Sequence, residues 1–205
     1  MRQIFWLYGL LLLSSLVEGW ISHVNASPLV LMITSAIDAI VVCGFAAVHR
    51  NKVGKLLARP NMDQRCVAEL VTIAGLAIIL LSLYFSLVQS AGIPIIQISV
   101  IFAKYGWPRW SMFALVCLTP AIFEELAFRG VIQTNLEAVL GSREALLIQA
   151  ALFSGLHLSP VILASHFFMG LVLGIMRTRS RSLYPGMLFH ATWNALVLIE
   201  EIYLK

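Results

Sequence analysis

The sequence predicts an all-α fold, a polytopic bundle of transmembrane helices, and three observations support this. Of the 205 residues, 60% are hydrophobic and only 12% are charged, whereas soluble domains are roughly half apolar and about a quarter charged. The mean hydropathy is +0.90. The apolar residues also gather in long stretches, and a helix needs about 20 mostly apolar residues to cross a bilayer. We therefore expect an integral, multi-pass membrane protein.

Seven apolar stretches are candidate spans: residues 4–17, 28–48, 67–88, 111–132, 145–158, 161–176 and 183–204. Two of them are short for a span, so we expect them to tilt little, to lie where the bilayer is thinned, or to have their ends covered by neighbouring helices. Residues 93–102 form a weaker, additional segment. Because Pro94, Gly106 and Pro108 interrupt the chain around it, we expect a short helix in the membrane interface there.

The first stretch has a second interpretation. Arg2 precedes its apolar run, and residues 24–26 resemble the small-residue cleavage site of a secretory signal peptide. We favour a retained helix. No repeat, low-complexity tract or long polar linker divides the chain, so we expect one continuous membrane domain. In it, residues 1–110 are N-terminal helices facing substrate or lipid, and residues 111–205 are the core that carries the chemistry.

The positions of the basic residues predict the orientation. Seven passes put most of the Lys and Arg on one side of the membrane: Arg2, the loop 49–66, Arg143 and the loop 177–182. Lys104, Arg109 and Lys205 fall on the other side. By the positive-inside rule the N-terminus is cytoplasmic, and we expect a prokaryotic cytoplasmic membrane. The net charge of +4 does not indicate nucleic acid, because the bases follow the loops and form no stripe with aromatic residues.

Several ionisable side chains lie inside predicted spans, at a cost of about 2.5 to 3.5 kcal/mol each on insertion scales. Asp38 lies in mid-span, and we expect it to hydrogen-bond to a neighbouring helix. One apolar helix carries Glu124, Glu125 and Arg129. Glu125 and Arg129 are i,i+4 neighbours with the acid first, the favourable order for an ion pair. Glu124 lies about 100° away around the helix, so it is free to face a cavity as a general base.

Pro120 allows two arrangements of this helix. It can occupy the first helical position behind a capping Thr119, or it can interrupt the hydrogen-bond ladder one turn upstream. In both arrangements the acidic residues lie near backbone groups that lack a helical partner.

Two further spans carry histidines. His157 shares a helix face with Phe153 at i,i+4, and His190 shares one with Asn194. Counted from the predicted cytoplasmic ends, these polar groups and Glu124 lie at similar depths, roughly 10 to 20 Å into the bundle. A free glutamate, two histidines and an asparagine on three helices are hard to explain by packing alone, so we expect them to meet in one pocket.

These motifs, in this order, resemble the CPBP family, which comprises CAAX proteases and bacteriocin-processing enzymes and is also called the Abi family. The family pattern is EExxxR, then FxxxH, then HxxxN. Here it is met by Glu124, Glu125 and Arg129, by Phe153 and His157, and by His190 and Asn194. The resemblance covers about residues 110 to 200, so it makes residues 111–205 a CPBP-like catalytic helical core.

The resemblance implies an intramembrane endopeptidase. Carried over, Glu124 would be the base that activates a water, with His157 as its partner. His190 and Asn194 would stabilise the oxyanion, a contribution of roughly 3 to 4 kcal/mol in a preorganised site. Glu125 and Arg129 would hold the helix in place, and Phe153 would support His157.

Zinc is the alternative to a metal-free site. Glu124, His157 and His190 are ligand types that zinc can bind with an open fourth position. However, the sequence has no His-Glu-x-x-His helix, and Asn194 is a poor zinc ligand. We therefore favour the glutamate mechanism and expect no cofactor.

The expected partners are the lipid bilayer and a membrane-associated protein or peptide substrate, such as a prenylated tail, a secreted peptide precursor or the anchor of a sorted surface protein. Nucleic acid is not expected, and nothing in the sequence indicates an oligomer. The main alternative is a non-catalytic scaffold or immunity protein that keeps the motifs for structure. A proton-coupled transporter is a weaker alternative. Transporters often contain internal repeats, and this sequence shows none.

Overall fold

The computed structural model describes residues 2–58, 60 and 62–203. Within these residues all regular structure is helical, as predicted. The elements are α1 (Arg2–Asn25), α2 (Pro28–Val48), α3 (Arg50–Leu56), α4 (Gln64–Ser90), α5 (Ile98–Lys104), α6 (Arg109–Phe113), the π-helix η1 (Ala114–Leu118), α7 (Thr119–Glu124), the π-helix η2 (Glu125–Ile132), α8 (Gln133–Leu140), α9 (Ser142–Leu156), α10 (Pro160–Ser180) and α11 (Tyr184–Tyr203).

Five of the described helices are long and apolar enough to cross a membrane: α1, α2, α4, the continuous helix from α6 to α8, and α10. The prediction of a polytopic membrane bundle is thus confirmed, whereas the count of seven spans is not. α9 has only 15 residues and begins with polar and charged side chains. α11 has 20 residues but carries His190, Asn194 and two glutamates, which lower its hydropathy.

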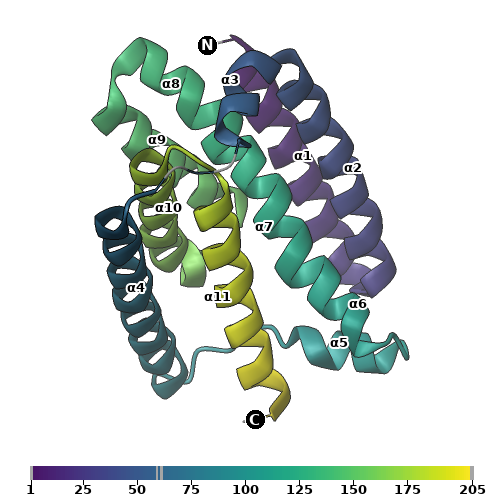
Figure 1. Ribbon diagram of the computed structural model, residues 1–205. Coiled ribbons are helices and arrows are strands. Elements are labelled where there is room, and N and C mark those ends of the chain that lie inside the picture. Colours follow the sequence, from purple (N-terminus) through teal and green to yellow (C-terminus); the bar gives the residue numbers. More distant parts are fainter. Residues whose placement is uncertain (1, 59, 61, 204–205) are drawn as a thin grey trace.

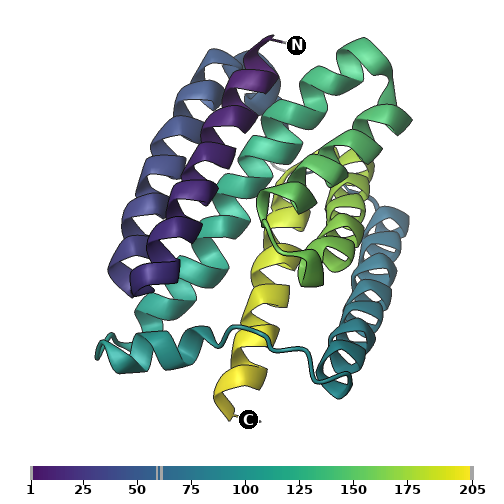
Figure 2. The ribbon, with the colours of Figure 1, turned by 180° about the vertical axis from the view of Figure 1, so that it is seen from behind.

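The helices run between two ends of the molecule, with the N-terminus at the upper end and the C-terminus at the lower end in Figure 1. α9 descends from the upper end through only part of this depth before α10 returns (Figures 1 and 2). The turn between them holds Leu158 in a positive-φ conformation (φ 51°). Irregular backbone inside a membrane is tolerated where it lines a cavity, and this turn carries His157.

The short helix expected near residues 93–102 is α5, which lies across the lower end of the bundle (Figure 1). A non-helical segment connects it to the end of α4. Phe102 of α5 is buried and packs edge-to-face on Trp107, with ring centroids 6.1 Å apart. α5 therefore closes the lower end of the bundle beneath the long helix.

The long helix from α6 to α8 contains two π-helical segments, which often occur at functional sites. Thr119 donates its hydroxyl to the carbonyl of Ala114, and Thr134 donates to that of Arg129, each five residues earlier. Of the two arrangements left open for Pro120, the structure has the second: the helix continues through Pro120, and Thr119 does not cap it.

The buried hydrophobic side chains of the described residues form three clusters. The first joins α1, α2, η2 and α9, and its members include Leu7, Val42, Phe128 and Phe153. The second joins α4, α10 and α11, and the third fills the lower end around Phe102. α1 is therefore an integral part of the packing.

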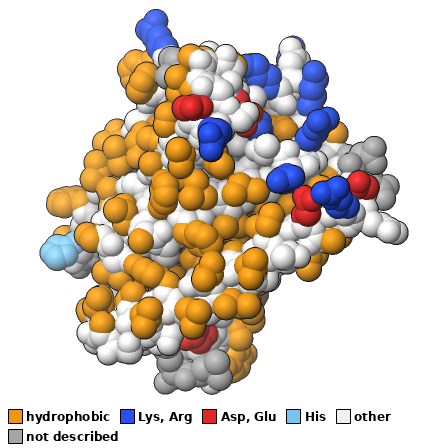
Figure 3. Space-filling model, turned by 90° about the vertical axis from the view of Figure 1, so that its left-hand side faces the viewer, with side chains coloured by type: hydrophobic (Ala, Val, Ile, Leu, Met, Phe, Trp, Pro, Cys, Tyr) orange, Lys and Arg blue, Asp and Glu red, His pale blue; other side chains and the backbone are white. Residues whose placement is uncertain are grey.

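The outer surface fits a lipid environment. Large hydrophobic side chains are exposed along α1, α2 and α4, among them Trp20, Ile40 and Leu87. Figure 3 shows hydrophobic side chains over the middle of one face, with most Lys and Arg near its upper end. The basic residues that the sequence placed on one side thus lie at one end of the bundle. Arg59 of this set, and Lys205 of the opposite set, lie outside the described residues.

Candidate active site

A cavity of about 870 Å³ opens between α1, α2, the long helix, the α9–α10 turn and α11. Its wall includes all four predicted catalytic residues, Glu124, His157, His190 and Asn194. The expectation that these side chains meet in one pocket is therefore met by the geometry. Their roles in a reaction stay predictions.

Glu124 is the last residue of α7, where its side chain is 27% exposed. Its Oε2 atom is buried and has no hydrogen-bond partner in the described part of the chain. The His190 ring lies beside this oxygen, with Nε2 at 3.8 Å. The carboxylate therefore keeps an oxygen whose acceptor capacity is unused, while the side chain as a whole lines the cavity, and a general base must have such an acceptor.

The predicted pair of Glu125 and Arg129 is present, with Arg129 Nη1 2.8 Å from Glu125 Oε1. The pair has a second function that the spacing did not predict. His190 Nδ1 lies 3.1 Å from the same oxygen, so Glu125 also fixes the His190 ring. Because a carboxylate accepts, Nδ1 donates, and Nε2 is turned towards Glu124.

Arg129 is fully buried, so its charge must be compensated within the protein. Besides Glu125, it donates through Nη2 to the carbonyl of Gly170, at 3.2 Å. Its guanidinium also lies over the Phe153 ring, 4.4 Å from the centroid, a favourable cation–π contact. Phe153 in turn packs edge-to-face on Phe128. The predicted support residues thus form one assembly behind the cavity.

Close packing of α9 on α10 is required for this assembly. A Cβ atom added to Gly170 would lie 2.8 Å from the Cα of Ala150, so only glycine fits. The approach exposes the Gly170 carbonyl to both Arg129 and Gln149, which donates to it at 2.8 Å.

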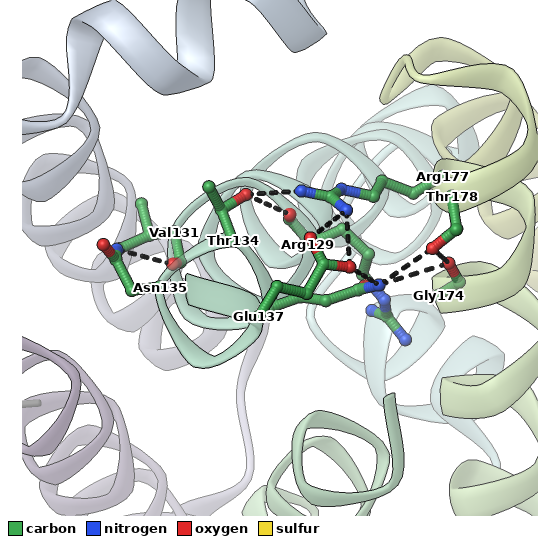
Figure 4. A network of polar contacts seen from close by, with 9 residues as sticks. Arg129, Val131, Thr134, Asn135, Glu137, Gly174, Arg177 and Thr178 are labelled. Carbon is green, nitrogen blue, oxygen red and sulfur yellow. Dashed lines mark hydrogen bonds and ion pairs between the residues drawn. The ribbon is translucent and has the colours of Figure 1, made fainter. Parts of the chain in front are cut away.

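A second polar network continues from this assembly towards the upper end (Figure 4). Arg177 donates through Nη1 to both Glu137 oxygens at 2.7 Å and through Nη2 to Thr134 at 2.6 Å. Gln133 links Glu137 to Thr178 and to the Gly174 carbonyl. These contacts hold α8 to α10. Because α8 is the C-terminal part of the long helix that also carries Glu124, they fix that part of the long helix against α10.

His157 lies at the C-terminal end of α9. Its Nδ1 is 3.0 Å from the carbonyl of Phe153, and its ring packs edge-to-face on the Phe153 ring at 5.1 Å. These two contacts explain why the i,i+4 spacing of Phe153 and His157 matters. The phenylalanine supplies both a backbone acceptor and a packing surface that fix the imidazole.

Asn194 of α11 is held by the long helix, through its η1 segment. Its Nδ2 donates to the carbonyl of Val116 at 3.0 Å. Val116 lies four residues before Pro120, and proline has no N–H to donate to that carbonyl. The proline therefore leaves an acceptor that orients Asn194, and the second amide hydrogen of Asn194 remains for a ligand.

Four ionisable residues of the wall were not recognised as part of the site, and one of them is His23, near the end of α1. His166 of α10 has its ring centroid 4.0 Å from that of His157. Asp38 and Glu18 lie on the opposite wall. The hydrogen bond expected for Asp38 stays a prediction, whereas Glu18 accepts a hydrogen bond from Thr34 of the neighbouring helix at 2.6 Å. Two features of the sequence could have identified these residues. One is a third histidine in an apolar span, and the other is the pair of acidic residues in the first two spans.

A metal site is the alternative that the sequence left open. Within the part of the chain that the structure describes, no three His, Cys, Asp or Glu side chains are arranged to hold a metal ion. His190 has its two nitrogens directed at two different carboxylates. The metal-free glutamate mechanism, with zinc as its alternative, stays a prediction.

Comparison with known proteins gives one match. Residues 105–196 match the family model described as type II CAAX prenyl endopeptidase Rce1-like. Over these residues the chain is similar to the CAAX protease family. The matched segment runs from before α6 into α11 and contains every predicted site residue. No curated protein and no solved structure matches the chain. α1 and α2, which complete the cavity wall, lie outside the segment.

Proposed function

We propose that this protein is an intramembrane endopeptidase that cleaves a membrane-associated protein or peptide with a water activated by Glu124. The single observation that carries the proposal is the unpaired, buried Oε2 of Glu124 beside His190, in a cavity shared with His157 and Asn194. The match of the surrounding segment to a CAAX endopeptidase family supports the reaction class.

In this reaction Glu124 removes one proton from the water, and His157 Nε2 accepts a hydrogen bond from the remaining O–H. The water oxygen attacks the peptide carbonyl carbon, and the carbonyl oxygen becomes an oxyanion. Glu124 then passes its proton to the amide nitrogen as the C–N bond breaks and the carbonyl re-forms, leaving a carboxylic acid and an amine. The same residue acts first as base and then as acid.

Asn194 and His190 are the proposed oxyanion donors. Asn194 donates its amide hydrogen that is not bonded to Val116. His190 donates through Nε2 in its imidazolium form, in which both ring nitrogens carry hydrogens. The carboxylate of Glu125, with Oε1 3.1 Å from Nδ1, supports this form while the oxyanion develops and Glu124 holds the proton of the water.

The substrate would enter between the catalytic wall and α1–α2. We propose that residues 1–110 supply the substrate-facing wall, because α1 and α2 line the cavity with Ser15, Glu18, Ser35 and Asp38. We also propose that the upper, basic end of the bundle faces the cytoplasm.

Replacement of Glu124 tests the proposal. The protein would be reconstituted in liposomes with a fluorogenic peptide ending in a prenylated cysteine followed by three residues, the CAAX arrangement. A general base commonly contributes 10²- to 10⁴-fold, so Glu124→Gln should lower kcat at least about 100-fold, with little change in KM. Glu144→Gln, at an exposed position of α9, is the matched control and should retain wild-type kcat.

Two results would contradict the proposal. One is wild-type cleavage by the folded Glu124→Gln protein. The other is the absence of cleavage by the wild type of both the prenylated peptide and a set of unmodified hydrophobic peptides. Full biological activity of a folded Glu124→Ala protein would instead favour the non-catalytic scaffold or immunity protein.

A further inference from the structure

His166, a further histidine of the cavity wall, has no part in the reaction proposed above. It lies in α10, outside the EExxxR, FxxxH and HxxxN motifs, and its side chain is partly buried. A histidine in an apolar membrane helix is costly unless its polar atoms are used. The contacts of the ring identify which nitrogen is already used.

His166 Nδ1 lies 3.0 Å from the carbonyl oxygen of Ile162. A carbonyl oxygen only accepts, so Nδ1 carries a hydrogen. The Ser165 hydroxyl is 3.3 Å from the same nitrogen, but its own hydrogen is directed at the Ile162 carbonyl, 2.9 Å away. In a neutral imidazole Nε2 is then an acceptor. It lies on the ring edge away from the α10 backbone, and the ring lines the cavity.

His157 has the same arrangement, because its Nδ1 donates to the carbonyl of Phe153. The two imidazole rings lie 4.0 Å apart between centroids, with an angle of 51° between their planes. Both rings also contact the Phe153 ring, at 5.1 and 6.1 Å. Packing therefore holds two adjacent acceptors side by side on one wall.

This spacing suits the two atoms that change bonding in peptide hydrolysis. In the tetrahedral intermediate the attacking oxygen and the amide nitrogen are bonded to one carbon, so they lie roughly 2.4 Å apart. Each of them reaches an acceptor about 2.8 to 3.0 Å away. Two acceptors a few ångströms apart can therefore serve both atoms at once. His157 is the acceptor on the water side, and His166 is its neighbour.

We propose that His166 is a substrate-binding residue whose Nε2 accepts the N–H of the scissile amide, so that the site favours secondary amides over esters. The inference rests on the proposed endopeptidase function. An ester has no N–H at this position, so it cannot use the acceptor. The contribution of His166 should therefore appear with an amide substrate and vanish with the matching ester.

The test uses the full chain in liposomes and the prenylated fluorogenic peptide in two forms, with the scissile bond either an amide or an ester. His166→Asn keeps a donor for the Ile162 carbonyl and loses the Nε2 acceptor. His166→Phe keeps the ring packing and loses both nitrogens. His166→Gln places an amide oxygen near the position of Nε2. His49→Asn, outside the cavity wall, is the control, and thermal unfolding in detergent reports on folding.

For the amide, His166→Asn and His166→Phe should lower kcat/KM about 10-fold, as for the loss of one hydrogen bond, while His166→Gln stays within about threefold of wild type. For the ester, all three variants should stay within about twofold, since no hydrogen bond is lost. If one variant does not fold, the comparison of amide with ester in the other two still shows whether His166 accepts the N–H of the scissile amide.

Equal losses on amide and ester would overturn the inference, as would wild-type amide cleavage by His166→Asn or His166→Phe. In either case an inactive Glu124→Gln protein leaves the proposed function standing. If Glu124→Gln cleaves both substrates at the wild-type rate, or the wild type cleaves neither, the proposed function fails and this inference fails with it.

Discussion

At the scale of single residues, the buried polar groups of the C-terminal half act as one connected set. Glu125 Oε1 is shared by Arg129 and His190, and Arg129 is shared by Glu125, Gly170 and Phe153. A buried charge that loses its partner is strongly destabilising. The residues behind Glu124 should therefore affect stability as well as activity.

Replacement of Glu125 separates these two effects. Glu125→Gln leaves Arg129 buried without a countercharge, and breaking such a pair typically costs about 3 to 5 kcal/mol. It also removes the charged acceptor of His190, so kcat should fall even in the folded fraction. Thermal or denaturant unfolding in detergent measures the first effect and peptide cleavage the second.

The exposed pair of Arg65 and Glu69 provides the control. The Arg65 side chain is 87% exposed, and such surface pairs contribute about 0 to 1 kcal/mol, so Arg65→Gln should leave the unfolding curve almost unchanged. Equal, small effects of Glu125→Gln and Arg65→Gln would contradict the role given to the buried pair.

At the scale of elements, the long helix and the α9–α10 turn position the site. The π-helical segment before Pro120 and the proline itself leave the Val116 carbonyl to Asn194 of α11. The partial descent of α9 brings His157 into the interior at a turn (Figure 2). Both features depart from regular helical spans, and both place a polar side chain on the cavity wall.

Replacement of Pro120 tests the first of these features. Alanine supplies an N–H that competes with Asn194 for the Val116 carbonyl, so Pro120→Ala should leave stability unchanged or raised. Since a misplacement of about 1 Å can cost about 100-fold in rate, we expect kcat to fall at least about 10-fold with KM little changed.

Pro160→Ala is the matched control for this substitution, because Pro160 occupies the first helical position of α10, where no helical hydrogen bond is lost. It should retain wild-type kcat. If Pro120→Ala retained wild-type kcat as well, the proline would have no part in orienting Asn194.

At the scale of the whole molecule, the basic end and the apolar belt determine how the bundle lies in a membrane. Arg50, Lys52, Arg143 and Arg179 lie at the end where α8 meets α9, and the C-terminus lies at the other (Figure 1). The anionic cytoplasmic leaflet and the positive-inside rule both favour the basic end in the cytoplasm.

Cysteine labelling tests this orientation. Ser142→Cys lies at the basic end between α8 and α9, and Ser90→Cys lies at the opposite end of α4; both positions are exposed. A membrane-impermeant maleimide added to intact cells should label Ser90→Cys, and should label Ser142→Cys only after permeabilisation. The wild-type chain gives the background from Cys43, Cys66 and Cys117. The reverse pattern would show that the orientation is wrong.

Much of the site was predictable because its signals are local in the chain. The Glu125–Arg129 pair and the support of His157 by Phe153 are i,i+4 contacts, which helical geometry fixes. The contact of His190 with Glu125 and that of Asn194 with Val116 join residues 65 and 78 positions apart. No spacing rule within one helix reaches such partners, so these contacts were not predicted.

The sequence by itself determined that this protein is a helical membrane bundle and predicted which polar motif residues meet in one cavity, because hydropathy and helical periodicity are local properties. The tertiary structure decided that Glu125 orients His190, that Pro120 anchors Asn194, and that His166, Asp38 and Glu18 share the cavity. It also showed that α9 is a short helix ending inside the bundle. These features depend on how helices far apart in the chain approach one another, which side-chain packing decides.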